Sequence, residues 1–438
     1  MFGGVEMNYS NEPHGVFFFI DNKSFYASCE SVMRGLDPLE AIIVVMSEQE
    51  NTNGGLVLAS SPMAKKMFHI TNVSRQRDIP YDDRILVVPP RMNLYIKMNL
   101  KINQLYQQFA APEDILPYSI DESLIDMTKS WRLFGETIEQ VAQLIQQTIH
   151  AKLGLYTTVG IGENPLQAKL ALDLYAKHDS NLRGKIKYED VEQKLWPVTE
   201  LTDVWSIGKR TATRLAKLHI HSLDELAHSN PYDLKAEFGI VGYQLFALAW
   251  GIDRTDLNEQ RPVKEPGFSN SQVLPRDYHH AAEIEVVIRE IGEQVAARIR
   301  AHQKKTTKIS LGIGFAYAAT SEERRSGFHC SKTILPTNDS NELATTLIQL
   351  FEQHWQGEAV RNVAVSYSGL YQDTGAQISL FQPVKAQLQR SKVDRLADQI
   401  HRQFGSSALV KASSLLPGAT AIERANLVGG HNGGNAYD

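Results

Sequence analysis

Short apolar runs and amphipathic stretches alternate between residues 16 and 200. The apolar runs have the length of buried strands and lie at Phe17–Ile20, Ile42–Val45, Ile85–Val88 and Thr157–Ile161. Residues Thr137–Leu153 space their apolar side chains as a helix does. This mixture predicts a domain of the α+β or α/β class.

The strand pattern stops near residue 200 and returns later in the chain. Residues 200–260 carry short helical patterns, broken at Ser206–Gly208 and at Phe238–Gly242, which predicts a small all-helical part. The polar, proline-bearing stretch 258–265 is typical of a linker.

A second mixed domain is expected after this linker. Its helix is predicted at Ala281–Ala301, and its strands at Thr307–Tyr317 and Val360–Tyr371. The tail that follows has an amphipathic helix around Lys392–Phe404 and a Gly/Asn-rich end, Gly429–Asn435, which we expect to be flexible.

Size and composition fit a soluble protein of several domains. The chain has 438 residues, of which 42% are hydrophobic and 22% charged, and a length prior suggests two to four domains. Its apolar runs are far shorter than the ~20 residues that span a bilayer, and its N-terminus lacks the pattern of a secretory signal. We therefore expect no membrane partner and a cytoplasmic location. Cys29 and Cys330 stand too far apart in sequence to indicate a disulfide framework or a zinc site.

The net charge of −5 argues at first against binding to nucleic acid. Phosphates, however, are neutralised by nearby cations and not by the average of the chain. One dense basic stretch holds Arg298, Arg300, Lys304, Lys305, Lys308, Arg324 and Arg325. It fits a DNA-binding surface and equally fits a solvated helix face that continues into a loop.

Carboxylates stand at two apolar segments. The strand predicted at Phe17–Ile20 ends on Asp21, and the segment Tyr118–Ile125, also expected to be a strand, carries Asp121 and Glu122. Acidic groups at the edge of a core repel one another and lose hydration unless a cation compensates them. Two Mg²⁺ ions bound there would suit phosphoryl transfer. Each segment taken singly could also be a surface turn or a helix cap.

Longer motifs around these acids narrow the choice. Residues Ile20–Glu30, which read IDNKSFYASCE, resemble the first motif of the Y-family DNA polymerases, and Ser119–Glu122 resembles their second. The resemblance extends from about residue 16 to 425. The wording FYASCE is especially similar to the branch with the DNA polymerase V catalytic subunit and its plasmid and Gram-positive relatives.

The resemblance implies a right-hand polymerase of the α+β class that carries out translesion synthesis. Such an enzyme transfers dNMP from dNTP to a primer 3'-hydroxyl with low fidelity during the response to DNA damage. The implied domains are the palm (14–24 and 91–184), the small fingers (25–90), the helix-hairpin-helix thumb (185–257), the linker (258–265), the little finger (266–371) and the tail (372–438).

The resemblance also implies roles for single residues. Asp21, Asp121, Glu122 and the carbonyl of Asn22 would hold two Mg²⁺ ions, which Mn²⁺ can replace. Tyr26 would be the steric gate against ribonucleotides. Its neighbour Phe25 is a further candidate nucleotide contact, although an ordinary core position is the better interpretation for it. The expected triphosphate contacts are Ser60, Ser61, Lys65 and Lys177, with Ala59 and Lys65 standing where the family often has Thr and Arg.

Primer–template DNA and a replication sliding clamp are the implied macromolecular partners. The expected DNA contacts are Gly208, Lys209 and Arg210 in the thumb, and Arg298, Lys304, Lys305 and Lys308 in the little finger. Gln377, Leu380 and Phe381 fit the clamp-binding pentapeptide Q-x-x-L-F, and a recombinase filament or accessory subunits could bind the tail. Two other readings stay open: a different two-metal phosphotransferase, such as a nucleotidyl cyclase, and a non-catalytic relative that acts at replication forks.

Overall fold

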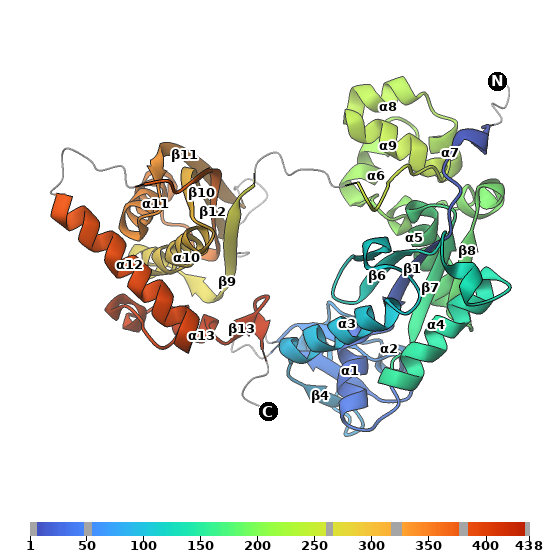
Figure 1. The fold of residues 1–438 in the computed structure, drawn as a ribbon, viewed down its shortest axis with the longest axis horizontal. Coiled ribbons are helices and arrows are strands. Elements are labelled where there is room, and N and C mark those ends of the chain that lie inside the picture. The colour runs from blue at the N-terminus through green and yellow to red at the C-terminus, as the bar shows by residue number, and fades with distance from the viewer. Residues whose placement is uncertain (1–6, 48–54, 260–265, 317–325, 376–383, 434–438) are drawn as a thin grey trace. The chain divides into compact units, whose positions relative to one another are not determined.

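A computed structural model of the chain describes residues 7–47, 55–259, 266–316, 326–375 and 384–433. The chain forms two compact units (Figure 1). Unit 1 comprises Met1–Met46, Val57–Pro89 and Asn93–Gln260, and unit 2 comprises the remaining residues. No helix in the described part of the chain is both long and apolar enough to cross a bilayer.

A five-stranded sheet with the order β5-β6-β1-β7-β8 forms the centre of unit 1. Its strands are β1 (Phe17–Asn22), β5 (Ile115–Pro117), β6 (Glu122–Asp126), β7 (Thr157–Gly162) and β8 (Arg183–Ile186). The apolar run of β1 suits its central place, since β6 and β7 pair with it on both sides in antiparallel register. The strands predicted at Phe17–Ile20 and Thr157–Ile161 are therefore confirmed.

Helix α5 (Pro165–Leu174) packs closely on this sheet, against β1, β7 and β8. Two glycines of β7 permit the approach. A Cβ atom at Gly160 would lie 2.1 Å from the carbonyl oxygen of Ala168, and one at Gly162 would lie 2.3 Å from the amide nitrogen of the same residue. The backbone of α5 thus occupies the space that side chains would take on most strands.

We expect Gly160→Ala to lower the free energy of unfolding by about 3 kcal/mol, the upper end of the usual cost of overpacking, because its methyl group would meet helix backbone. Thermal denaturation followed by circular dichroism measures the change. Gly208→Ala is the matched control, since no atom lies within 4 Å of a Cβ there and its φ of −83° suits any residue. Equal melting temperatures for both variants would contradict the close contact.

A smaller three-stranded sheet and several helices complete unit 1. The sheet has the order β3-β2-β4, with β2 (Ile43–Met46), β3 (Val57–Ser60) and β4 (Leu86–Val88). Besides α5, the described part of the chain before residue 200 contains the α-helices α1 (Phe25–Met33), α2 (Pro62–Phe68), α3 (Met92–Tyr106) and α4 (Ile138–Leu153). The predicted all-helical part follows as α6 (Lys209–Lys217), α7 (Leu223–Ala227), α8 (Pro231–Phe238) and α9 (Ile240–Ala249).

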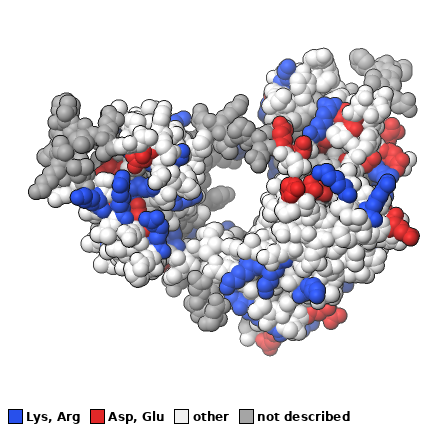
Figure 2. Space-filling view, in the orientation of Figure 1, with Lys and Arg blue, Asp and Glu red and all other residues white. Residues whose placement is uncertain are grey.

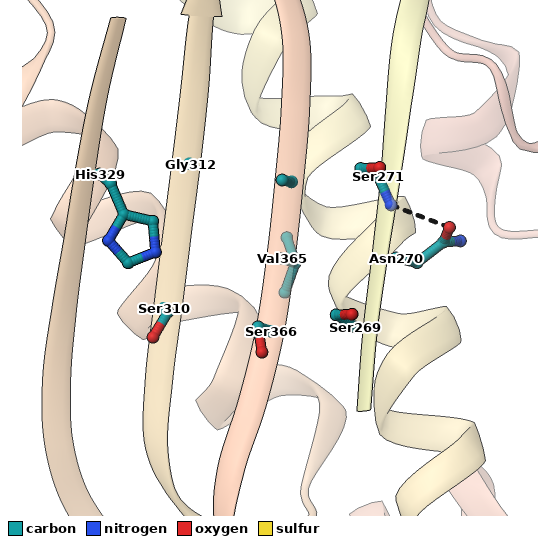
Figure 3. A pocket seen from close by; sticks show the side chains of 9 residues that line it. Ser269, Asn270, Ser271, Ser310, Gly312, His329, Val365 and Ser366 are labelled. Carbon is teal, nitrogen blue, oxygen red and sulfur yellow. Dashed lines mark hydrogen bonds between the residues drawn. The ribbon is translucent and has the colours of Figure 1, made fainter. Parts of the chain in front are cut away.

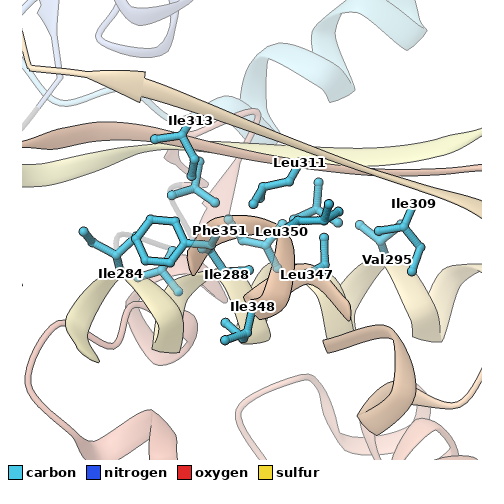
Figure 4. Packing of buried hydrophobic residues seen from close by; sticks show 14 of the residues in the cluster. Ile284, Ile288, Val295, Ile309, Leu311, Ile313, Leu347, Ile348, Leu350 and Phe351 are labelled. Carbon is cyan, nitrogen blue, oxygen red and sulfur yellow. The ribbon is translucent and has the colours of Figure 1, made fainter. Parts of the chain in front are cut away.

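Unit 2 is built on a four-stranded antiparallel sheet with the order β11-β10-β12-β9. Its strands are β9 (Phe268–Tyr278), β10 (Lys304–Phe315), β11 (Gly327–Thr337) and β12 (Val360–Gln372). Helices α10 (Ala281–Ala301) and α11 (Ser340–His354) bury their apolar sides against one face of it (Figure 4). Alternate side chains such as Ile309, Leu311 and Ile313 point into this core, which leaves Ser310 and Gly312 for the opposite face.

The tail packs on unit 2 to a greater extent than its sequence suggests. Its elements are α12 (Val384–Phe404), α13 (Ala421–Arg424), β13 (Leu427–Val428) and β14 (His431–Asn432). The described part of the Gly/Asn-rich end, residues 429–433, contains β14, which pairs with β13 in a two-stranded ribbon. Arg300, whose side chain is 10% exposed, forms ion pairs with Asp394 and Asp398 of α12, which fix that helix against α10.

Candidate active site

Asp21 and Glu122 lie directly opposite each other on the paired strands β1 and β6. The prediction that Tyr118–Ile125 forms one strand is wrong, because the chain turns between β5 and β6. In that turn the amides of Tyr118 and Ser119 both donate to the carbonyl of Glu122. Asp121 is the last residue of the turn. All three predicted catalytic carboxylates therefore lie where β1 ends and β6 begins.

Hydrogen bonds fix Asp121 in this turn. The hydroxyl of Ser119 donates to Oδ1 of Asp121 over 2.7 Å, and both the amide and the side-chain nitrogen of Asn22 donate to the Asp121 carbonyl over 2.9 Å. The side-chain oxygen of Asn22 is buried and has no hydrogen-bond partner within the described structure. Asn22 therefore ties the end of β1 to the turn that carries Asp121.

Two lysines face the carboxylates. Lys177 Nζ lies 3.4 Å from Asp21 Oδ2, and Lys169 Nζ lies 2.7 Å from Glu122 Oε1. Asp173 contacts both lysines, at 2.7 Å from Lys177 and 3.3 Å from Lys169. Lys177 is a predicted site residue, whereas Lys169 and Asp173 are not. Their spacing of four residues along one helical segment is the signal that could have revealed them.

Burial raises the pKa of Asp21 to about 6; Lys177 acts against this rise, and the charges of Asp121 and Glu122 add to it. The three carboxylates thus interact electrostatically, and an added cation would lower the free energy of their ionised forms.

The oxygen atoms at this end of β1 and β6 are the kind of ligand that Mg²⁺ prefers. They are the carboxylate oxygens of Asp21, Asp121 and Glu122 and the side-chain oxygen of Asn22, which has no hydrogen-bond partner among the described residues. They are not gathered into a ready-made metal site. Among the described residues, no group of three or more His, Cys, Asp or Glu side chains is arranged to hold a metal ion. Asp21 and Glu122 contact lysines instead.

Lys23 and Lys65 extend the positive charge around Asp21. Lys65, on α2, donates a hydrogen bond from Nζ to the hydroxyl of Ser24 over 3.2 Å. Burial lowers the pKa of both lysines, and the nearby charge of Lys177 lowers it further. Lys23 is absent from the predicted set, although it stands two residues after Asp21. Three ammonium groups near one carboxylate form a surface suited to a polyanion.

Tyr26 lies on α1 beside the carboxylates. Its ring stacks on Tyr95 with centroids 4.3 Å apart and an angle of 12° between the planes. Tyr95 in turn donates a hydrogen bond to the buried Glu30. Burial raises the pKa of Tyr26, and the nearby charge of Asp121 raises it further. Phe25 is only 3% exposed and belongs to the core.

Ser60 and Ser61, predicted to contact the triphosphate, are fully buried. Ser60 donates its hydroxyl proton to the carbonyl of Ile70, and Ser61 accepts hydrogen bonds from the amides of Ile43 and Ala64 as the N-cap of α2. Both hydroxyls thus serve the fold and form no part of the surface that a phosphate could contact.

The predicted thumb residues lie at the start of α6. Gly208 is its N-cap, and Lys209 and Arg210 are exposed in its first turn. The left-handed residue of this turn is Ser206, with a φ of 73°, whereas Gly208 has an ordinary conformation. The turn therefore does not require a glycine at position 208, and a side chain there would meet no atom within 4 Å of its Cβ.

The basic stretch of unit 2 is partly used inside the fold. Lys305 pairs with Asp373 at 3.1 Å, Arg298 donates to the carbonyl of Ser269, and Lys304 donates to Gln372. Lys308 is exposed. Figure 2 shows local groups of Lys and Arg side chains on both units, so the acidic total hides positive patches. Arg324 and Arg325, like the predicted clamp peptide with Gln377, Leu380 and Phe381, lie outside the described residues.

Small polar residues cover the helix-free face of the unit 2 sheet (Figure 3). Ser331, Ser310, Ser366 and Ser269 stand side by side in register, one on each strand. His329 lines the same hollow from β11. The sequence prediction missed this row because its members are far apart along the chain and meet only through strand pairing.

Three sequence profiles match the chain. Residues 20–173 match the impB/mucB/samB family, residues 188–220 match the helix-hairpin-helix (HHH) motif of the IMS family, and residues 266–380 match the C-terminal domain of the impB/mucB/samB family. A search of solved structures finds a chimeric Y-family DNA polymerase of Dbh and Dpo4, with a TM-score of 0.62 and 20% identity over 82% of this chain and 99% of the other. That likeness shows the fold.

Curated relatives resemble the chain over nearly its full length. A candidate UV-damage repair protein of Bacillus subtilis (strain 168), UvrX, is 39% identical over 97% of this chain and 99% of its own. DNA polymerase IV 2 of the same organism is 33% identical over 95% and 98%. These names support the family as a whole and not a particular closeness to DNA polymerase V. Together with the profiles, they show that this chain belongs to the Y family of DNA polymerases.

Proposed function

We propose that this chain is a translesion DNA polymerase that acts in the response to DNA damage and copies DNA with low fidelity. The observation that supports this best is that Asp21, Asp121 and Glu122 lie together where β1 ends and β6 begins, with lysines beside them. The three carboxylates suit two Mg²⁺ ions, and the lysines suit a triphosphate.

In the reaction, the primer 3'-oxygen would form a bond to the α-phosphorus of a dNTP while the bond to pyrophosphate breaks. Bound Mg²⁺ would supply activation of the 3'-hydroxyl and stabilisation of the leaving oxygen. Asp21, Asp121 and Glu122, with the Asn22 carbonyl, would hold the ions. Lys23, Lys65 and Lys177 would neutralise the triphosphate as point charges, because an ammonium group lacks the two-pronged geometry of Arg. The ring of Tyr26 would exclude a ribose 2'-hydroxyl.

The domains proposed from the sequence would supply the contacts with DNA. The palm is 14–24 with 91–184, the fingers are 25–90, the thumb is 185–257 and the little finger is 266–371. The exposed start of α6, with Lys209 and Arg210, would contact phosphates without reading bases. The serine row would add neutral hydrogen-bond donors, while the exposed Lys308 would add charge.

Primer extension with all four dNTPs and Mg²⁺ tests this function. We expect the full chain to copy an undamaged template with frequent errors and to extend a primer past an abasic site or a bulky adduct. A high-fidelity product with arrest at every lesion would refute translesion synthesis. The absence of any template-dependent extension would refute polymerase activity, as expected for a non-catalytic relative.

The pentapeptide Gln377–Phe381 is proposed to tether the enzyme to a sliding clamp, with Leu380 and Phe381 filling an apolar pocket. Replacing both by Ala should abolish the stimulation of synthesis by the clamp and leave distributive synthesis unchanged. The matched control replaces Val393 and Leu396, two exposed apolar residues of α12. Equal clamp stimulation in the peptide variant and in the unchanged chain would refute the tether.

A further inference from the structure

Lys169 is a buried cation at the active site for which neither the sequence motifs nor the proposed reaction supplies a role. Its side chain is 8% exposed and lies on α5. The ammonium group is 2.7 Å from Glu122 Oε1 and 3.3 Å from Asp173 Oδ2, and it stands 4.7 Å from the centre of the Phe19 ring. The centre of the Tyr118 ring, which packs edge-on against Phe19, is 6.0 Å from the same ammonium group.

These contacts compensate for the cost of burying the charge. They do not make the ion pair a clear source of stability, because apolar residues of similar volume often replace a buried pair at no cost. What the pair does fix is geometry. A bond of 2.7 Å to one carboxylate oxygen restricts the rotation of the Glu122 side chain and leaves Oε2 for another ligand.

Asp173 links this contact to the other side of the site. It pairs with Lys169 through one oxygen and with Lys177 through the other, and Lys177 reaches Asp21. Opposite charges therefore alternate from Glu122 through Lys169, Asp173 and Lys177 to Asp21. The close packing of α5 on β7, at Gly160 and Gly162, holds Lys169 and Asp173 in place.

We propose that Lys169 is a positioning residue that holds Glu122 ready for metal binding, with Asp173 orienting Lys169 and Lys177 together. The inference rests on the proposed two-metal function. Groups that hydrogen-bond to metal ligands set the orientation of those ligands, and their loss typically costs about 10–100-fold in metal affinity or activity.

Lys169→Met tests the role, because it keeps length and apolar volume and removes the charge. The full chain is bound to primer–template with a 3'-dideoxy end and dNTP, and Mn²⁺ binding is measured by electron paramagnetic resonance. We expect Mn²⁺ to bind about 10–100-fold more weakly, the Mg²⁺ needed for half-maximal extension to rise in parallel, and the KM for dNTP to stay close to its original value. Lys169→Arg should restore part of the affinity.

Lys185→Met is the control, since Lys185 forms a pair of similar length, 2.6 Å, with Glu139, which is not one of the three predicted metal ligands. Unchanged Mn²⁺ affinity and Mg²⁺ dependence in Lys169→Met, even beside a lower melting temperature, would overturn the proposal. If that variant does not fold, Asp173→Asn replaces it; weaker Mn²⁺ binding with a raised KM for dNTP supports the proposal, and no change in either overturns it. Failure of the unchanged chain to bind Mn²⁺ or extend primers would count against the proposed function instead.

Discussion

Primer extension should fall by about three orders of magnitude or more when Asp121 and Glu122 are both replaced by Ala, a loss of roughly 4 kcal/mol or more of transition-state stabilisation. The variant lacks two of the three carboxylates that lie where β1 ends and β6 begins, so the metal ions would lose most of their protein ligands. Single-turnover incorporation of one dNTP with saturating Mg²⁺ measures the change in the chemical step.

Asp126→Ala is the control for this pair. Asp126 ends the same strand, β6, and accepts a hydrogen bond from the amide of Thr128, away from the site. It should keep activity near the original level. Binding of primer–template, measured by fluorescence anisotropy, should be similar in all three chains. Substantial extension by the Asp121→Ala, Glu122→Ala variant would exclude these acids as the catalytic ligands.

Tyr26→Ala should raise the incorporation of ribonucleotides relative to deoxyribonucleotides by about 100-fold, the discrimination expected where a pocket rejects one added hydroxyl by shape. The ring is held flat against Tyr95, so a ribose that meets it cannot displace it at low cost. The ratio of kcat/KM for rNTP and dNTP, measured on one template base, reports the change.

Tyr26→Phe keeps the ring and its stacking and should therefore discriminate nearly as well as the unchanged chain. The ratio of the two kcat/KM values separates a loss of selectivity from a general loss of activity, because a general loss lowers both values by the same factor. An unaltered ratio in Tyr26→Ala would show that another group selects the sugar.

The sequence predicted the parts of the site that depend on local pattern. An apolar run that ends on Asp21 becomes the central strand β1, as its composition requires. The turn before Glu122 was missed because Tyr118–Ile125 is apolar enough to read as one strand, and only the pairing of β5 with β6 reveals the hairpin. Lys169 was missed for a related reason, since lysines on helices are mostly solvated and its burial depends on tertiary packing.

Charge was harder to predict than hydrophobicity. In sequence, Arg300 and Lys305 belong to one basic stretch, yet the fold pairs them with Asp398 and Asp373. The polar row through Ser310 and Ser366 has no local signal, because four strands contribute one residue each. Local patterns thus indicate which elements form, while the surface they present depends on register and on partners distant in the chain.

The contact between Arg300 and α12 affects how the tail can be studied. A chain shortened to residue 383 would keep every predicted catalytic and clamp-binding residue and still leave Arg300 without Asp394 and Asp398. The shortening would also remove the carbonyl of Gly418, which accepts a hydrogen bond from the hydroxyl of Tyr278, and the amide of Thr420, which donates to the buried Glu290. A shortened enzyme could therefore lose activity through unfolding of unit 2 alone, and a deletion phenotype would say little about partners of the tail. Point substitutions on the exposed side of α12 separate the two causes.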